Sequence, residues 1–166
     1  MGLDMYLKKG KRIPGKSIKQ IEEIEDEIYY GDNKELLDEY KDYIIEIKYE
    51  HIKTTLYVLL NEVVYWRKAN AIHNWFVINV QNGNDDGRTY EVKIEQLEKL
   101  IDTCKTVLNN LSLAKKLLPT KEGFFFGSTD YNKMYVKELE RTVKILEKVL
   151  KNTDFDKEYI VYTSNW

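Results

Sequence analysis

The sequence has few of the residues that form disulfide bonds, bind metals or build long loops. Its 166 residues include one cysteine, two histidines, two prolines and eight glycines. A single cysteine cannot form an intramolecular disulfide, and His51 and His73 have neither cysteine partners nor a His-Glu-x-x-His pattern. We therefore expect no disulfide, no metal and no cofactor.

An excess of one charge and long apolar segments are also missing. The chain has 26 Lys and Arg against 28 Asp and Glu, so no overall field attracts nucleic acid or an anionic membrane. No apolar run approaches the roughly 20 residues that span a bilayer, and the first residues lack a signal-peptide pattern. We therefore expect a soluble, cytoplasmic protein with neither nucleic acid nor a membrane as partner.

Aromatic residues, in contrast, are abundant. The chain contains 13 Tyr, 3 Trp and 5 Phe. Tyrosine offers an apolar ring and a hydrogen-bonding tip, and the scarcity of glycine and proline favours long helices. A chain of this length is suited to one domain with a real core, so residues 1–166 are interpreted as a single domain.

Strict alternation of apolar and polar residues occurs near both ends of the chain. Leu3, Met5 and Leu7 alternate with Asp4 and Tyr6, and alternation returns over residues 159–164. This period of two predicts half-buried strands. With helical patterns between them, the expected fold is a mainly helical α+β domain with a small sheet formed by the terminal strands. We also expect Trp166 to dock against the domain.

Apolar residues at helical spacing fill most of the remaining sequence. The predicted helices begin after Ser17, run from Thr54 or Thr55 to about Val80, from about Ile94 to Asn110, from Leu111 to Leu118, and after Thr129. Cys104 falls on the apolar face of the third of these and is expected to be a buried thiol. The stretch 36–49 fits either a helix or a strand.

The densest group of chemically capable residues lies in the predicted helix 54–80. Helical spacing would align Glu62, Trp66, Asn70 (or Ala69) and His73 on one stripe, with Arg67 and Asn74 beside it. Arginine binds phosphate with two parallel hydrogen bonds, tryptophan stacks on bases, and asparagine pairs with polar edges. In the alternative interpretation Trp66 belongs to the core, Arg67 is solvated and His73 forms internal hydrogen bonds.

A second candidate is the loop Gly123–Tyr131, with three consecutive phenylalanines. Gly127, Ser128 and Thr129 would open a helix, whose first N–H groups can bind an anion. The alternative is an ordinary helix start capped by Thr129 and Asp130. Evidence for catalysis is thinner, because nothing in the spacing requires His73 to act with Glu62, Asp4 or Asp130, and we regard an enzyme as the less favoured class.

Several long motifs resemble a family of small phage and prophage proteins. They are MGLDMYL at residues 1–7, YWRKANAIHNWF at 65–76, VQNG at 80–83, LLPT at 117–120 with GFFFGST at 123–129, and the ending SNW. The resemblance covers the chain except residues 8–58, which look like a variable insertion. It implies a viral setting and carries no catalytic residues.

In that setting we expect a protein that sequesters a nucleotide-type immune signal, ADP-ribose-like or cyclic, and so blocks bacterial anti-phage defence. Trp66 with Phe125 or Phe126 would stack, Arg67 and the amides of Gly127, Ser128 and Thr129 would hold phosphate, and Asn70, His73 and Asn74 would bind base or sugar. The alternatives are a protein-binding inhibitor of a host defence protein and a nucleotide-processing hydrolase. Self-association into a homo-oligomer is left open.

Overall fold

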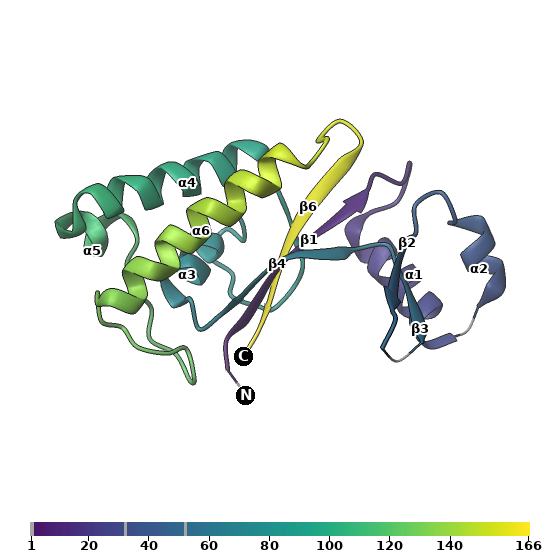
Figure 1. The fold of residues 1–166 in the computed structure, drawn as a ribbon, viewed down its shortest axis with the longest axis horizontal. Helices are drawn as coiled ribbons and strands as arrows, with labels where there is room; N and C mark the ends of the chain where they lie inside the picture. The colour runs from purple at the N-terminus through teal and green to yellow at the C-terminus, as the bar shows by residue number, and fades with distance from the viewer. Residues whose placement is uncertain (1, 32, 52) are drawn as a thin grey trace.

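The two terminal strands lie side by side in one sheet, with the other elements attached around them (Figure 1). The computed structural model describes residues 2–31, 33–51 and 53–166, so Met1 of the opening motif lies outside them. Along the chain the elements are β1 (Asp4–Lys11), α1 (Ile18–Gly31), α2 (Lys34–Glu39), β2 (Ile45–Tyr49), β3 (Thr54–Val58), β4 (Asn61–Arg67), α3 (Asn70–Asn79), β5 (Tyr90–Val92), α4 (Ile94–Asn109), η1 (Leu111–Leu113), α5 (Ala114–Leu117), α6 (Lys133–Lys151) and β6 (Glu158–Asn165).

The main sheet has the strand order β4-β1-β6-β5, with antiparallel neighbours throughout. The β1–β6 ladder runs without a break from the pair Asp4 and Asn165 to the pair Lys11 and Glu158. The prediction of an α+β fold whose terminal strands form the sheet is confirmed. β2 and β3 form a separate two-stranded hairpin.

Each face of the main sheet supports its own hydrophobic core. Ile160 and Tyr162 of β6 pack into a large cluster with residues of α3, α4 and α6. Tyr159 and Val161 point the other way and pack with residues of α1. Figure 1 shows α3, α4 and α6 on one side of the sheet and α1, α2 and the hairpin on the other. The predicted insertion, 8–58, supplies most of this second side.

Two expectations about buried residues are confirmed. Leu3, Met5 and Leu7 are fully buried, as their alternation predicts. Cys104 on α4 is also fully buried, and burial raises the pKa of its thiol to about 12. A thiol with so high a pKa is unreactive near neutral pH.

The predicted long helix 54–80 is wrong. The chain forms β3, β4 and then α3 instead, and Lys68 lies between β4 and α3 with a positive φ of 58°. Apolar and β-branched residues are so dense here that helical and strand periods both fit, and pairing of β4 with β1 decides for a strand. On β4, Val64 and Trp66 face the core. The predicted stripe of Glu62, Trp66, Asn70 and His73 therefore does not exist.

The start of the last helix also differs from the prediction. Thr129 does not cap it: Asn132 does, and its side chain accepts hydrogen bonds from the N–H groups of Met134 and Tyr135. The ambiguous stretch 36–49 divides between the end of α2 and β2. Within the three described ranges, no helix is both long and apolar enough to cross a membrane.

Replacing Leu7 tests the central position of β1. Leu7 is fully buried between β4 and β6, so Leu7→Ala should lower the free energy of unfolding by about 2–5 kcal/mol. Chemical denaturation measures this loss. Lys8→Ala, one residue along on the opposite face, is the control and should change stability by less than about 0.5 kcal/mol. Equal losses in the two variants would contradict the assigned faces of β1.

Candidate functional site

A cavity of about 350 Å³ opens where β4 ends and α3 begins. We call it the α3 cavity. It brings together four of the residues predicted from the sequence, Arg67, Asn70, Gly127 and Ser128. Its lining is Arg67, Lys68, Ala69, Asn70, Ala71, Ile72, Thr120, Gly127, Ser128, Asp130, Asn132, Met134, Tyr135, Glu138 and Leu139.

The start of α3 forms part of the wall of this cavity and lacks a capping side chain. The N-cap is Ala69, which has no polar side-chain atom, and the first turn contains no acidic residue. The first N–H groups of a helix have no acceptor within the helix and carry a partial positive charge. The ten-residue α3 therefore offers uncompensated donors to the cavity.

Basic side chains lie beside these donors. Arg67 and Lys68 line the cavity and both are exposed at the surface. The nearest carboxylate recorded for Arg67 is Asp4, whose Oδ1 lies 3.8 Å from Arg67 Nε. At that distance the guanidinium keeps most of its hydrogen-bonding capacity. The arrangement favours an anionic group at the start of α3.

Lys68 and Gly127 pack closely against each other, and both have positive φ angles. Lys68 has a φ of 58°, and Gly127 has a φ of 93° and lies directly against it. A Cβ at position 127 would lie 3.1 Å from Lys68 Cβ and 3.3 Å from the Lys68 carbonyl oxygen. Glycine is required here both by its backbone conformation and by this close approach.

Asn70 holds the phenylalanine loop against α3. Its buried amide nitrogen donates to the carbonyl oxygens of Phe126, at 3.1 Å, and Ser128, at 2.9 Å. Its amide oxygen accepts the Lys121 N–H at 3.2 Å. Since both amide protons are used, Asn70 shapes the cavity wall and has no proton left to donate to a ligand.

Acidic and apolar side chains complete the α3 cavity. Asp130 accepts a hydrogen bond from the Ser128 hydroxyl at 2.9 Å, and Glu138 pairs with Arg141 at 3.0 Å. Ile72 and Leu139 are buried apolar residues of the lining, whereas Met134 is largely exposed. The cavity therefore combines basic side chains at the start of α3 with carboxylate acceptors and apolar surface.

The other residues predicted from the sequence lie outside the α3 cavity. Trp66 is fully buried and donates to the Thr142 hydroxyl at 3.0 Å, so it presents no ring face to a ligand. Asn74 donates to the Pro119 carbonyl oxygen at 3.3 Å. The Thr129 carbonyl oxygen accepts from the Thr120 hydroxyl. Because α6 begins at Lys133, the amides of residues 127–129 do not form a helix start.

The three phenylalanines of the loop have separate environments. Phe126 is buried, with its ring 5.3 Å from that of His73 and 6.2 Å from that of Trp166. Phe124 and Phe125 are exposed and pack edge to face. Phe125 adopts a φ of 65°, in the left-handed region. The loop thus carries one ring into the protein and leaves two outside.

His73 belongs to a buried network that links distant segments. Its Nδ1 lies 2.8 Å from the Tyr162 hydroxyl and its Nε2 lies 3.1 Å from Asp85 Oδ2, which Lys121 also contacts at 3.3 Å. Burial lowers the pKa of His73, and this effect exceeds the opposing influence of Asp85. Both ring nitrogens have hydrogen-bonding partners, so His73 has a structural role in this conformation.

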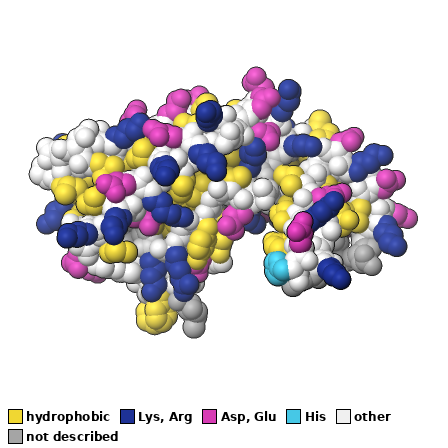
Figure 2. All heavy atoms as spheres, in the orientation of Figure 1, with side chains coloured by type: hydrophobic (Ala, Val, Ile, Leu, Met, Phe, Trp, Pro, Cys, Tyr) yellow, Lys and Arg dark blue, Asp and Glu magenta, His cyan; other side chains and the backbone are white. Residues whose placement is uncertain are grey.

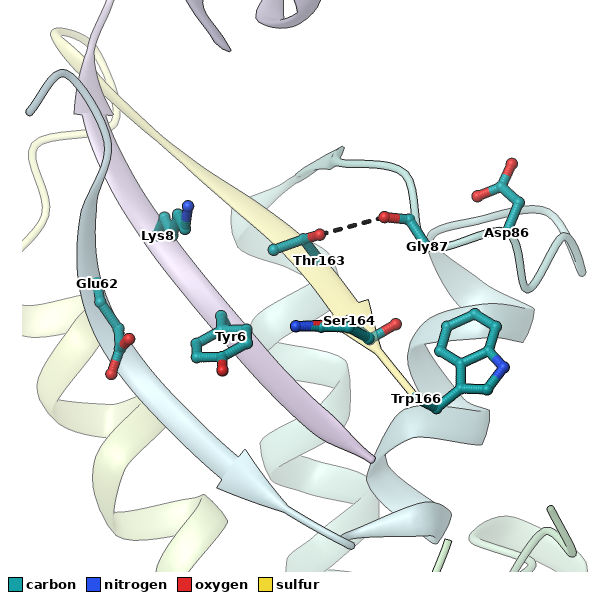
Figure 3. Close-up of a pocket in the computed structure, with 9 residues that line it drawn as sticks. Tyr6, Lys8, Glu62, Asp86, Gly87, Thr163, Ser164 and Trp166 are labelled. Atoms are coloured by element: carbon teal, nitrogen blue, oxygen red, sulfur yellow. Dashed lines mark hydrogen bonds between the residues drawn. The ribbon is translucent and has the colours of Figure 1, made fainter. Parts of the chain in front are cut away.

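A second, larger hollow of about 660 Å³ is lined by Tyr6 and Lys8, on the side of the sheet away from the core that Leu7 shares with α3, α4 and α6. Figure 3 shows Glu62 on β4, Tyr6 and Lys8 on β1 and Thr163 on β6 across neighbouring strands, with Asp86, Gly87 and Trp166 beyond them. We call this hollow the sheet-face trough. The Trp166 ring lies 5.7 Å from that of His73, so its expected docking is confirmed, although the ring remains partly exposed.

Sequence reasoning missed several residues of these sites. Tyr162 and Asp85 reach His73 from a distant strand and a turn, which no local pattern reveals. Lys68 lies next to Arg67 in the motif YWRKANAIHNWF, and its basic side chain beside Arg67 was the signal that could have added it to the site. The trough residue Tyr6 carried a usable signal, since alternation already placed it opposite Leu7, whereas Lys8 lies past the predicted strand.

The buried His73 predicts a pH-dependent stability. Its folded-state pKa lies below the unfolded value of 6.5, so the fold favours neutral imidazole. The resulting stability is complete above pH about 6.5 and is lost as pH falls through the folded-state pKa. The free energy of unfolding of the wild type should therefore fall between pH 7.5 and 5, and that part of the fall should vanish in His73→Gln.

The surface histidine provides the matched control. His51→Gln should retain the wild-type pH dependence in the same denaturation series. An unchanged pH dependence in His73→Gln would contradict the assigned network.

Neither hollow carries the donor set of a metal centre. No group of three or more His, Cys, Asp and Glu side chains that could hold a metal ion was found in the part of the chain that the structure describes. The uncapped start of α3, with Arg67 and Lys68 beside it, is the most distinctive chemistry of the α3 cavity. Comparison with protein-family models, curated proteins and solved structures found no match to this chain.

Proposed function

We propose that the protein binds a nucleotide-type small molecule in the α3 cavity and sequesters it without converting it. The observation that carries the proposal is the uncapped start of α3 flanked by Arg67 and Lys68. Helix starts of this kind bind phosphate through their N–H groups, and arginine adds two parallel hydrogen bonds. A phosphate or diphosphate is the chemical group that fits best.

The remaining lining suits the rest of a nucleotide. Asp130 and Glu138 supply carboxylate oxygens that accept hydrogen bonds from sugar hydroxyls. Met134 and Leu139 supply apolar surface for a base. The cavity volume of about 350 Å³ lies within the range of small-molecule sites, roughly 300–1,000 Å³.

The burial and hydrogen bonding of His73 favour binding over catalysis. His73 is fully buried and both of its ring nitrogens have partners, so no general base of this type faces the cavity. On the resemblance to phage and prophage proteins, the proposed role is capture of a nucleotide immune signal, ADP-ribose-like or cyclic, to block anti-phage defence.

Calorimetric titration with ADP-ribose tests the proposal. The wild type should bind, and Arg67→Ala should bind about tenfold or more weakly, because a charge-assisted hydrogen bond to phosphate is removed. Lys68→Gly should also lose affinity while keeping its melting temperature, since glycine adopts a positive φ without steric cost. Arg88→Ala, an exposed arginine outside the α3 cavity, is the control and should bind as the wild type does.

The fate of the ligand separates the alternatives. The ligand should be recovered intact after the protein is heat-denatured. Recovery of a cleaved product would favour the nucleotide-processing hydrolase. If neither ADP-ribose nor a cyclic nucleotide binds, or if Arg67→Ala binds as tightly as the wild type, the proposal is wrong.

A protein-binding inhibitor has one observation in its favour. Phe124 and Phe125 are exposed at the tip of a loop whose base is fixed by Asn70. Exposed aromatic pairs often mark contact sites for other proteins. Capture of a host defence protein that is lost in Phe124→Ala, with no bound small molecule, would support this function instead.

A further inference from the structure

The sheet-face trough continues beyond the strands into the space beneath the β2–β3 hairpin. A neighbouring hollow of about 530 Å³ lies between α1, the hairpin and the start of β4, and Lys8 and Glu62 line both. We call the two together the extended trough. Figure 2 shows the surface indented between the helical side of the molecule and the hairpin side. None of its lining residues lines the α3 cavity.

Carboxylates dominate the charge of the extended trough. Among its described lining residues, Glu25, Asp26, Glu62 and Asp86 are acidic and Lys8 is the single base. Asp26 and Glu62 form no ion pair with any described residue, and both are exposed. A nearly neutral protein therefore carries a local excess of negative charge here, which repels nucleic acid and anionic lipid and attracts cations.

Exposed aromatic rings line the same surface. Tyr29 and Tyr30 on α1 are 55% and 80% exposed, Tyr49 on β2 is 38% exposed and Trp166 beyond β6 is 45% exposed. Tyrosine and tryptophan faces attract lysine and arginine through cation–π interactions. Rings and carboxylates together are the chemistry that recognises basic side chains.

We propose that the extended trough binds an extended, lysine- and arginine-rich peptide segment of a partner protein. The size of the trough favours a peptide over a small amine, because its two hollows together exceed the roughly 1,000 Å³ that bounds most small-molecule sites. Its two ends also carry separate aromatic groups, the α1 tyrosines and Trp166, which a single small cation cannot reach at once. The site is independent of the α3 cavity.

Glu25 shows how one side of this surface is fixed. Its Oε2 accepts the N–H groups of Leu59 and Leu60, each at 2.6 Å, so the carboxylate joins α1 to the turn before β4. The acidic wall is therefore held in place before any peptide arrives. A preformed wall lowers the entropy lost on binding.

Fluorescence anisotropy with a labelled eight-residue peptide of alternating lysine and alanine tests the proposal. Binding should saturate, and the double variant Asp26→Asn, Glu62→Gln should weaken it about tenfold or more, because two carboxylates facing the peptide are lost. The matched control Glu98→Gln, Asp102→Asn removes two exposed carboxylates from α4, outside the trough, and should change the affinity less than about twofold. Tyr30→Ala should weaken binding without changing the melting temperature, since Tyr30 is largely exposed.

The contrary outcomes are distinct. Equal losses in the trough and α4 double variants would show nonspecific attraction and overturn the proposal, as would equal binding of a glutamate and alanine peptide. Amide shifts in NMR spectra should concentrate on β1, α1 and the end of β6 when the lysine peptide is added. Shifts confined to the α3 cavity, or an absence of saturable binding, would also overturn the proposal. Titration with ADP-ribose remains a separate result, because the two sites share no lining residue.

Discussion

Pairing of β1 with β6 is the interaction on which the other parts of the structure depend. The ladder joins residues 4–11 to 158–165, and side chains of β6 enter a hydrophobic core on each face of the sheet. Hydrophobic burial on both sides fixes the register, because a slip by one residue would exchange the two faces. β4 then pairs with β1 and β5 with β6. The end of β4 determines where α3 begins, and the start of β5 determines where the turn containing Asp86 ends.

This arrangement gives the α3 cavity and the extended trough opposite charge. The end of β4 brings Arg67 and Lys68 to the uncapped start of α3, which makes that region suited to anions. The outer face of β4 and β1, together with α1, collects carboxylates and tyrosines, which suits cations. Net charge is nearly zero, so this separation cannot be seen in the composition. Local placement, and not overall charge, sets the chemistry of each site.

Sequence patterns predicted the fold well where one period excluded the other. The alternation of Leu3, Met5 and Leu7 fits only a strand, and the spacing around Cys104 fits only a helix; both elements are present. The stretch 54–80 satisfied both periods, and pairing of β3 with β2 and of β4 with β1 selected strands for its first half. The wrong helix prediction changed which residues were expected at the ligand site. In the strand, Trp66 faces inward and Arg67 outward, whereas a helix would have placed Trp66 beside Asn70.

Some contacts of the candidate site lie beyond any local pattern. Tyr162 meets His73 through packing of β6 against α3, and Arg67, Asn70, Gly127 and Ser128 meet because the loop folds back onto α3. The motifs contained these four residues but did not reveal why they lie close together. They lie close because one buried side chain forms hydrogen bonds with backbone groups of the loop.

Asn70 is that side chain, and its position distinguishes between two groups of almost equal shape. The carbonyl oxygens of Phe126 and Ser128 both point at its amide nitrogen. Aspartate would fill the same volume, but it would set a third oxygen against those two with no proton between them. The loop is therefore held to α3 by the polarity of one terminal atom, and a change of nitrogen to oxygen at this atom would convert attraction into repulsion.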